Sequence, residues 1–268
     1  MATLVGFHAH PDDEAIAQGG TLARAAAEGH RVVLVFATRG ELGEYPENFL
    51  VDGETLGERR ERETQAAAAA LGVHRVEFLG YLDSGMDGAA SNADPSCFAC
   101  ADVDGAATKL AAILSDERAD VLTVYDEHGT YGHPDHIQVH RVGHRAAAIA
   151  NTPRVYEATM NRDHLKRLIV AARDLGIDLP DMPDPDSFDG FGLGDDEITT
   201  VVDVTAFVEQ KRAAMAAHAS QIAENSIFLS LAEPAFSLTW GTEFYVRVGA
   251  EAGTTETWLF EDERATTR

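Results

Sequence analysis

Cysteine is almost missing from this chain of 268 residues, which contains only Cys97 and Cys100. Two cysteines cannot form the disulfide framework that holds small secreted domains together. Their C-x-x-C spacing occurs in redox pairs, but such a pair normally opens a helix after a strand, and two sulfurs alone do not complete a structural zinc site. Because the pair lies in a loop-like stretch, the sequence favours two thiols without a function.

Lysine is also scarce, since only Lys109, Lys166 and Lys211 are present. Lysine and arginine together number 21 against 45 aspartates and glutamates, so the formal net charge is -24. A chain this acidic repels the phosphates of nucleic acids and of anionic membranes, and we expect neither as a partner. The acidity itself fits either a saline cytoplasm or a need for solubility.

Long hydrophobic runs are missing as well. No run approaches the ~20 apolar residues that a membrane-spanning helix needs, and no basic segment before an apolar run marks a signal peptide. We therefore expect a cytoplasmic protein. Aromatic residues make up only 7% of the chain, but 45% of its residues are hydrophobic, which is enough for a globular core. The length suits one large domain, and the oligomeric state stays open.

Apolar segments alternate with helix-forming segments along most of the chain. The predicted strands cover residues 4–7, 31–38, 75–79, 120–125 and 154–159. The predicted helices cover residues 14–28, 54–71, 106–117, a segment that ends at about 151, and 164–175. This alternation predicts an α/β fold, with a Rossmann-like, mostly parallel sheet that carries helices on both faces.

The last third of the chain is expected to complete the same domain. We predict a catalytic core at residues 1–175, then a lid and edge strands at 176–250, and a frayed tail at 251–268. Within the middle part, 176–196 is rich in proline, aspartate and glycine and is expected to be irregular. Residues 199–204 could form an edge strand or belong to a small second sheet, 205–219 a helix, and 243–248 another strand.

The stretch from Phe7 to Glu14 combines His8 and His10 with three consecutive carboxylates behind Pro11. It follows the first predicted strand and precedes a helix. Acidic side chains can cap a helix N-terminus, but one is enough for a cap, and three in a row repel one another. Imidazole and carboxylate are the ligands that a borderline cation such as Zn²⁺ selects. The pattern therefore favours a metal or catalytic role over a cap alone.

A second stretch follows the predicted strand at 120–125 and offers Tyr131, His133, Asp135 and His136. Open α/β sheets place their sites at the carboxyl ends of strands, so both stretches are expected at one edge of the sheet. Two histidines and one carboxylate with an open position form a hydrolytic zinc arrangement. A further carboxylate would act as general base, and a tyrosine hydroxyl or a protonated histidine as oxyanion donor.

Together the two stretches resemble the motifs of the PIG-L/LmbE-like zinc-dependent N-deacetylases, namely His10-Pro11-Asp12-Asp13-Glu14 after an apolar strand and Tyr131-Gly132-His133-Pro134-Asp135-His136. The resemblance covers roughly the first 160 residues and extends more weakly through His218-Ala219-Ser220-Gln221. It implies a zinc-dependent amidohydrolase that removes an N-acyl group, first of all an acetyl group, from a glucosamine-containing small molecule. The family includes deacetylases of the mycothiol pathway and mycothiol-conjugate amidases.

Matching positions to the family implies a role for each residue around the metal. His10, Asp13 and His136 look like the ligands of one zinc ion, although Fe²⁺ or Co²⁺ would satisfy the same donors. Asp12 would be the general base that deprotonates the attacking water and returns the proton to the leaving amine.

The resemblance also implies roles around the substrate. His133 resembles the residue assigned to oxyanion stabilisation or acid catalysis, with Asp135 orienting it and Tyr131 reaching the carbonyl oxygen. Arg60 matches a sugar-binding arginine and Asp83 a hydroxyl-binding aspartate. Glu41 falls in a loop of the site. The sugar-binding arginine could also be Arg59 or Arg62, because both stand close to Arg60 in the sequence.

Simpler interpretations apply to the remaining histidines and acids. His8 and Glu14 adjoin the expected ligands and are predicted to support them or to cap the helix. We expect His128, His140 and His144 to lie on a helix surface or behind the metal ligands. His218 could contact the site or pack in the core.

Two alternatives to an N-deacetylase stay open. One is an amidase of a larger conjugate, either a mycothiol conjugate or a secondary metabolite. The other is a non-catalytic sugar- or metal-binding protein on the same fold, because a fold does not determine a function. The complete set of ligands, base and oxyanion donor argues against the second. The expected partner is a small-molecule N-acyl amino sugar.

Overall fold

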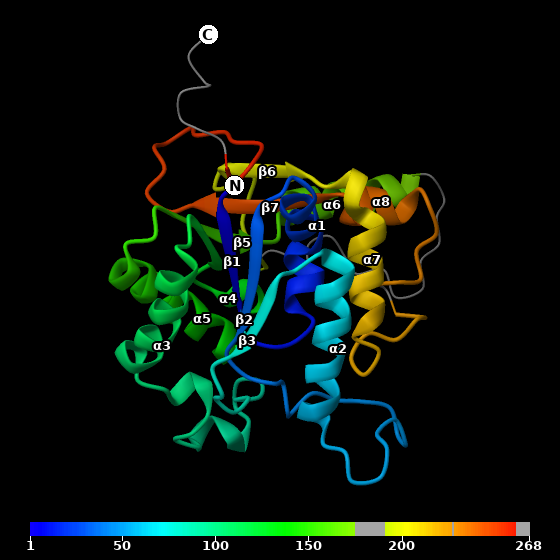
Figure 1. The fold of residues 1–268 in the computed structure, drawn as a ribbon. Helices are drawn as coiled ribbons and strands as arrows, with labels where there is room; N and C mark the ends of the chain where they lie inside the picture. Colours follow the sequence, from blue (N-terminus) through cyan, green and yellow to red (C-terminus); the bar gives the residue numbers. More distant parts are fainter. Residues whose placement is uncertain (175–190, 227, 261–268) are drawn as a thin grey trace.

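The computed structural model describes residues 1–174, 191–226 and 228–260 as an α/β arrangement (Figure 1). Its strands are β1 Thr3–His8, β2 Arg31–Phe36, β3 Arg75–Phe78, β4 Val121–Tyr125, β5 Arg154–Thr159, β6 Thr200–Asp203 and β7 Thr242–Arg247. Its α-helices are α1 Asp13–Ala27, α2 Leu56–Leu71, α3 Val103–Glu117, α4 Gly129–Gly132, α5 Pro134–Ala150, α6 Arg162–Asp174, α7 Val208–Ala217 and α8 Ala235–Trp240. Short 3₁₀ helices lie at η1 Ala90–Ala93, η2 Phe98–Cys100 and η4 Thr205–Phe207.

The strands form one 7-stranded sheet in the order β3-β2-β1-β4-β5-β7-β6. Strands β1 to β5 pair in parallel, and β7 pairs antiparallel with both β5 and β6. The predicted α/β fold with a mostly parallel sheet is therefore confirmed, and the strand expected near residue 200 is the edge strand β6 of this same sheet. The strand order turns at the neighbours β1 and β4, and sheets of this kind bind ligands at such a turning point.

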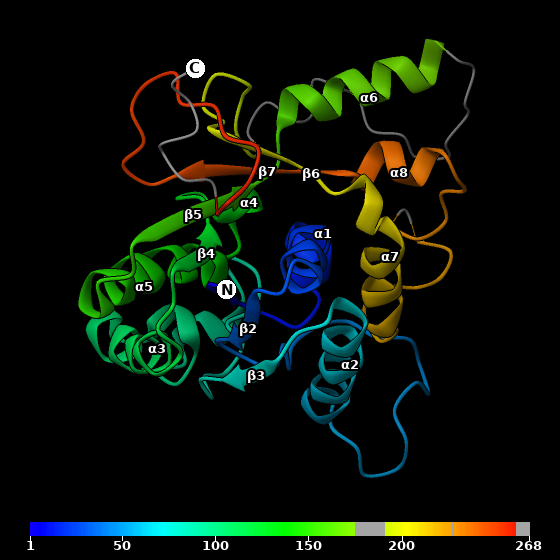
Figure 2. The ribbon, with the colours of Figure 1, turned by 45° about the horizontal axis from the view of Figure 1, so that its top comes forward.

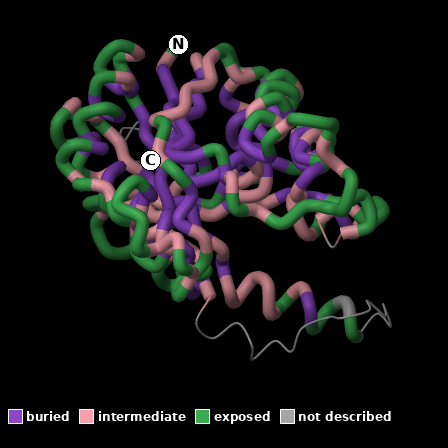
Figure 3. Tube along the Cα trace, turned by 90° about the horizontal axis from the view of Figure 1, so that it is seen from below, coloured by how far each residue is buried: buried purple, intermediate pink, exposed green. Residues whose placement is uncertain are grey.

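Alternate side chains along the central strands fill two cores, one on each face of the sheet. On β2, Val32, Leu34 and Phe36 belong to one core, whereas Val33 and Val35 belong to the other. Helices α1, α2 and α7 cover the first face, and α3 and α5 cover the second (Figure 2). Figure 3 shows the buried residues concentrated along the strands at the centre. Burial on both faces explains why β2 is apolar at every position after Arg31.

A buried ion pair ties α1, α7 and β7 together. The side chains of Lys211 and Glu243 are each 1% exposed, and Nζ lies 2.6 Å from Oε1. Glu243 also accepts hydrogen bonds from the backbone N–H groups of Gly20 and Thr21, each at 2.8 Å. A Cβ on Gly20 would lie 2.4 Å from Val204, so only glycine allows this close approach. The buried carboxylate thus meets one ammonium and two amides, which offset its loss of water.

The structure differs from the sequence prediction at several boundaries. Helix α3 begins at Val103 and not at 106, because the side chain of Asp102 accepts a hydrogen bond from Gly105 N at 2.8 Å and caps the earlier start. Helices α4 and α8 have no counterpart in the prediction. Cys97 and Cys100 are free thiols, the first buried and the second exposed.

The end of the chain also departs from expectation. The frayed tail predicted from 251 does not hold for residues 251–260, because Glu256 N donates to Thr199 O at 2.8 Å and Leu259 is fully buried. Residues 261–268 lie outside the described residues, and so does most of the irregular segment predicted at 176–196. Among the described residues, no helix combines the length and the apolar composition that crossing a membrane requires.

Candidate active site

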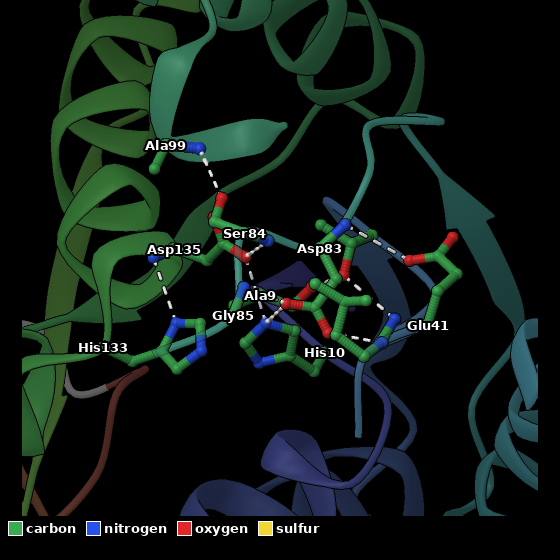
Figure 4. Close-up of polar contacts among 12 residues, drawn as sticks. Ala9, His10, Glu41, Asp83, Ser84, Gly85, Ala99, His133 and Asp135 are labelled. Atoms are coloured by element: carbon green, nitrogen blue, oxygen red, sulfur yellow. Dashed lines mark hydrogen bonds and ion pairs between the residues drawn. The ribbon is translucent and has the colours of Figure 1, made fainter. Parts of the chain in front are cut away.

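The two histidine-rich stretches meet at the carboxyl ends of β1 and β4, which pair side by side. His10, Asp12 and Asp13 follow β1, and the second group stands before and within the start of α5. A third segment, the loop after β3, brings Asp83 against His10, with Oδ1 3.6 Å from Nε2 (Figure 4). Residues from three segments therefore converge at the point where the strand order turns.

Asp13 links the two histidines that were predicted as ligands. Its Oδ2 lies 3.5 Å from His10 Nδ1, and its Oδ1 lies 3.4 Å from His136 Nε2. Burial alone would raise the pKa of Asp13, but the charges and hydrogen bonds of His136 and His10 outweigh it and hold that pKa well below its usual range. The carboxylate is therefore charged and faces both rings.

These distances fit a shared ion. Two donor atoms that each lie ~2.1 Å from one tetrahedral zinc ion are about 3.4 Å apart. The second ring nitrogen of His136, Nδ1, is buried without a hydrogen-bond partner among the described residues. His10, His133 and His136 also place one nitrogen each within 4.8 Å of one another. His10 and His136 are thus common to the predicted ligand set and to this cluster, which offers the imidazole and carboxylate donors of a borderline cation.

Asp12 occupies a strained backbone position with φ of 105°. A non-glycine residue in that region costs ~1–3 kcal/mol and persists where its surroundings hold it. Its backbone N–H donates to Glu14 Oε2 at 2.9 Å, and its Oδ2 lies 3.3 Å from Arg60 Nη2. Burial raises the pKa of Asp12 to about 6 in spite of the attraction of Arg60. A carboxylate with that pKa suits proton transfer near neutral pH.

Arg60 lies behind Asp12 and is only 3% exposed. Its guanidinium donates to the backbone oxygens of Gly40, at 2.8 Å, and Pro11. Arg60 is the arginine that reaches the site, because its neighbours Arg59 and Arg62 both pair with Glu54. The sequence predicted a sugar-binding arginine; in the structure, the guanidinium of Arg60 holds Pro11 and Asp12 on one loop and Gly40 on another.

His133 precedes α5 and caps it, since its Nδ1 accepts a hydrogen bond from Asp135 N at 3.1 Å. Nδ1 acts as acceptor, so the proton sits on Nε2 in the neutral ring. Burial, followed by the nearby His10 and His136, lowers the pKa of His133 to about 4. The ring is therefore neutral at pH 7 and has one N–H to donate.

Asp135 contacts His133 through its backbone N–H, whereas its carboxylate faces other partners. The carboxylate is fully buried and accepts hydrogen bonds from Ser84, from N at 2.9 Å and from Oγ. Its Oδ2 lies 3.2 Å from His10 Nε2 (Figure 4). Carboxylates behind metal-binding histidines normally hold the ring in this way. Asp135 thus supports His10.

Tyr131 stands at the exposed side of the site and is 46% exposed. Its hydroxyl lies 3.3 Å from His136 Nε2, and its ring meets that of His133 edge-on at 6.2 Å. Gly129 allows this arrangement, because a Cβ there would lie 2.7 Å from the Cβ of His136 and its φ is +62°. The predicted oxyanion donors, Tyr131 and His133, both lie beside the ring of His136, with centroids 4.8 and 5.4 Å from it.

Asp83 and Glu41, predicted on the substrate side, do lie together. Asp83 is 6% exposed and accepts hydrogen bonds from Gly85 N at 2.8 Å and Leu42 N at 3.2 Å. Burial would raise its pKa, but the hydrogen bond and charge of His10 and these two amides bring the pKa below its usual range. Glu41 Oε2 accepts from Asp83 N at 3.2 Å, so it shapes the loop that carries Asp83.

The supporting residues behind the site were only partly foreseen. Glu14 accepts from Asp12 N and also pairs with the fully buried His218, with Oε1 2.6 Å from Nε2. His218 therefore packs behind the loop of Asp12 and is not a lining residue. His8, expected as a support, bonds through Nδ1 to the hydroxyl of Tyr125 at 3.1 Å, and burial lowers its pKa to about 4.

Sequence reasoning missed Ser84 and Tyr125. Ser84 joins the loop after β3 to α5, since its Oγ donates to Asp135 and accepts from Ala99 N at 2.9 Å. Tyr125 ends β4 and stacks on the ring of His136, with centroids 4.4 Å apart. A serine in a loop and a tyrosine at a strand end have no distinctive pattern, and only the position of Ser84 directly after Asp83 could have marked it.

Comparisons with known proteins agree with this geometry. The family profile PIG-L: GlcNAc-PI de-N-acetylase matches residues 5–147. A protein of Thermomonospora curvata named 1D-myo-inositol 2-acetamido-2-deoxy-alpha-D-glucopyranoside deacetylase is 42% identical over an alignment of 272 positions, gaps included, that covers 93% of this chain and 91% of that protein. A protein of the same name from Nocardioides sp. is 40% identical over an alignment of 285 positions, gaps included, that covers 93% of each chain.

Solved structures share the fold at lower identity. The N,N'-diacetylchitobiose deacetylase from Pyrococcus horikoshii matches with a TM-score of 0.58 and 20% identity, over 91% of this chain and 83% of that one. A 4-carboxy-2-hydroxymuconate hydratase from Pseudomonas putida matches with a TM-score of 0.57 and 19% identity, over 94% and 98%. Two different reactions thus occur on this fold, and the fold alone does not decide between them.

Proposed function

The chain belongs to the PIG-L family of GlcNAc-PI de-N-acetylases, and we propose that its substrate is 1D-myo-inositol 2-acetamido-2-deoxy-α-D-glucopyranoside. The resemblance inferred from the two motifs is therefore confirmed. As a member of the family the chain is a hydrolase of the N-acetyl amide of an amino sugar. The name shared by relatives that align over nearly the whole chain supports the choice of substrate.

We propose that His10, Asp13 and His136 hold one Zn²⁺ ion. The support is the position of Asp13, 3.5 Å from His10 and 3.4 Å from His136, and the carboxylate of Asp135 that holds the far side of the His10 ring. An ion bound there would supply Lewis-acid chemistry, polarising the amide carbonyl and lowering the pKa of water. Fe²⁺ and Co²⁺ accept the same donors.

Asp12 is the general base in this proposal. Its pKa of about 6 leaves most of the carboxylate ionised at pH 7 while keeping it basic enough to take a proton from the attacking water. Arg60 fixes the orientation of the carboxylate from behind, and Glu14 holds the backbone N–H of Asp12. The same carboxyl then returns the proton to the leaving amine.

His133 and Tyr131 stabilise the charge that develops on the carbonyl oxygen. The neutral His133 ring donates from Nε2, because Asp135 N occupies its Nδ1. The Tyr131 hydroxyl, beside His136, is the second donor. Donors that are already in place before the reaction contribute to catalysis because they need no reorganisation as the charge forms.

On the sugar side we propose that Asp83 accepts a hydrogen bond from a ring hydroxyl, with Glu41 positioning its loop. Arg60 acts through Asp12, since its three contacts lie on the loop of Asp12 and on Gly40. A cytoplasmic location and the exclusion of nucleic acids stay predictions from the sequence.

The main support for this proposal is that Asp12 contacts Arg60, whereas Asp13 contacts both predicted histidine ligands. An assay of amine release tests it. Purified enzyme with Zn²⁺ is given the N-acetylglucosaminyl-inositol, free N-acetylglucosamine, or a larger amide conjugate, and free amine is measured. We expect the highest kcat/KM for the first substrate. A higher kcat/KM for the conjugate would instead indicate an amidase, and no amine from any of the three would contradict a hydrolytic role. Protein with Asp12→Asn serves as the matched blank.

A further inference from the structure

A second group of side chains that could hold a metal ion includes two histidines of α5, one and two turns beyond the proposed ligand His136. His140 and His144 stand one helical turn apart and face Glu157 of β5, the strand that runs alongside α5 (Figure 2). His144 Nε2 lies 2.8 Å from Glu157 Oε1, and His140 Nδ1 lies 3.4 Å from the same oxygen. The sequence predicted these two histidines only as helix-surface or supporting residues.

The spacing of the three side chains suits one ion. One nitrogen from each ring and one oxygen of Glu157 lie within 4.8 Å of one another, and residues four apart on a helix share a face. The exposed fractions of the side chains are 22% for His140, 30% for His144 and 16% for Glu157, so solvent reaches the cluster. Small side-chain rotations would bring the donors to the ~3.4 Å separation of tetrahedral ligands.

The surroundings also resemble those of a metal site. His140 Nδ1 lies 3.1 Å from the carbonyl oxygen of Tyr125. In metal-binding histidines, the nitrogen that donates to such a carbonyl is the one that does not bind the ion, so His140 would offer Nε2 to it. Glu157 pairs with Val124 in the sheet register, so the carboxylate is fixed on a central strand. The donors come from rigid elements, a helix and the strand beneath it.

We propose that His140, His144 and Glu157 form a second, accessory site for a borderline divalent transition cation such as Zn²⁺, separate from the proposed catalytic ion. Two imidazoles and one carboxylate select such cations over Ca²⁺ and Mg²⁺, which prefer oxygen ligands. The bound ion would clamp α5 to β5 and leave a coordination position open to water. This site goes beyond the proposed function and does not depend on it.

Metal counting tests the site independently of activity. Protein freed of metal by a chelator is titrated with Zn²⁺ by calorimetry, and the ions retained after gel filtration are counted. We expect two ions per chain for the wild type, one for His144→Ala, one for His136→Ala and none for the double variant. Glu157→Gln, which keeps the volume of the side chain, should weaken the second binding event at least tenfold. The exposed His74, replaced by alanine, is the matched control and should leave two ions.

Each departure from these counts has a distinct meaning. One ion in the wild type, lost with His136→Ala, would show that the cluster on α5 is only a hydrogen-bonded pair of histidines and would overturn the accessory site. Two ions retained by His144→Ala would overturn it as well. An unchanged count in His136→Ala would contradict the proposed catalytic ligands and leave the accessory site standing. Circular dichroism of the metal-free variants, matched to wild type, shows that lost ions do not reflect unfolding.

Discussion

Arg60 Nη2 lies 3.3 Å from Asp12 Oδ2, and the arginine side chain is 3% exposed. The guanidinium lowers the pKa of Asp12 against the larger effect of burial, and the balance places that pKa at about 6. The base is active when ionised, so activity falls as the pH drops through this pKa. Arg60 therefore sets where the acid limb of the pH profile lies.

Replacement of Arg60 by methionine should move that limb to higher pH, because the pKa of Asp12 rises when the cation is removed. The measurement is kcat/KM across the acidic and neutral range, with metal content checked at each pH. Arg60→Lys keeps the charge and should shift the limb less. An unchanged acid limb in Arg60→Met would mean that Asp12 is not the titrating base.

His133→Ala should lower kcat by about 10²–10³-fold, the usual effect of removing one oxyanion donor, and leave the bound metal in place. The reason is that Asp13, and not His133, completes the proposed ligand set. Metal analysis beside steady-state kinetics distinguishes the two roles. The exposed His128, changed to alanine, is the control. Loss of the ion with His133→Ala would make this histidine a ligand.

Lys211→Met should lower the free energy of unfolding by about 3–5 kcal/mol, because it leaves the carboxylate of Glu243 buried without its cation. Urea denaturation of the metal-free protein measures the change. Lys109 provides the comparison, since its ammonium lies at the surface over Tyr81, and Lys109→Met should cost less than ~1 kcal/mol. Equal losses for the two lysines would show that the buried pair adds nothing specific.

Glu117 should make the free energy of unfolding depend on pH in the acidic range. Arg31 and Arg75 donate hydrogen bonds to it at 3.0 and 2.9 Å, and these, Arg31 first, lower its pKa from 4.5 to about 2. A lowered pKa gives stabilisation that is complete above 4.5 and disappears as the pH falls through about 2. Glu117→Gln should therefore be less stable than wild type by about 1 kcal/mol at neutral pH and equally stable near pH 2. A difference that stays constant with pH would exclude this origin.

The sequence predicted the parallel part of the sheet and the meeting of the two histidine-rich stretches for the same physical reason. Strands buried on both faces, such as Arg31–Phe36, are apolar throughout and stand out from the helices between them. Polar motifs directly after two such strands must meet when those strands pair, as β1 and β4 do. Strand pairing thus predicted that the two stretches meet, whereas the choice of His10, Asp13 and His136 within them came from the family resemblance.

What the sequence could not predict depends on contacts between distant segments. The contact of Asp135 with His10 and Ser84 spans residues that are far apart in sequence, and no local pattern encodes it. The role of Arg60 depends on its contacts with the backbone oxygen of Pro11, which lies 49 positions before it in the sequence, and with Asp12. The packing of residues 251–260 likewise follows from pairing of Glu256 with the edge strand and not from composition.

Substitutions at the adjacent Asp12 and Asp13 separate proton transfer from metal binding, since the two carboxylates have the same chemistry but different proposed roles. Zinc content and turnover of N-acetylglucosaminyl-inositol are measured together for Asp12→Asn and Asp13→Asn. We predict that Asp12→Asn keeps one ion at the catalytic site and loses about 10²–10⁴-fold in kcat, whereas Asp13→Asn loses that ion together with activity. Loss of the ion in Asp12→Asn, or near wild-type turnover in either variant, would show that the two carboxylates do not divide these roles.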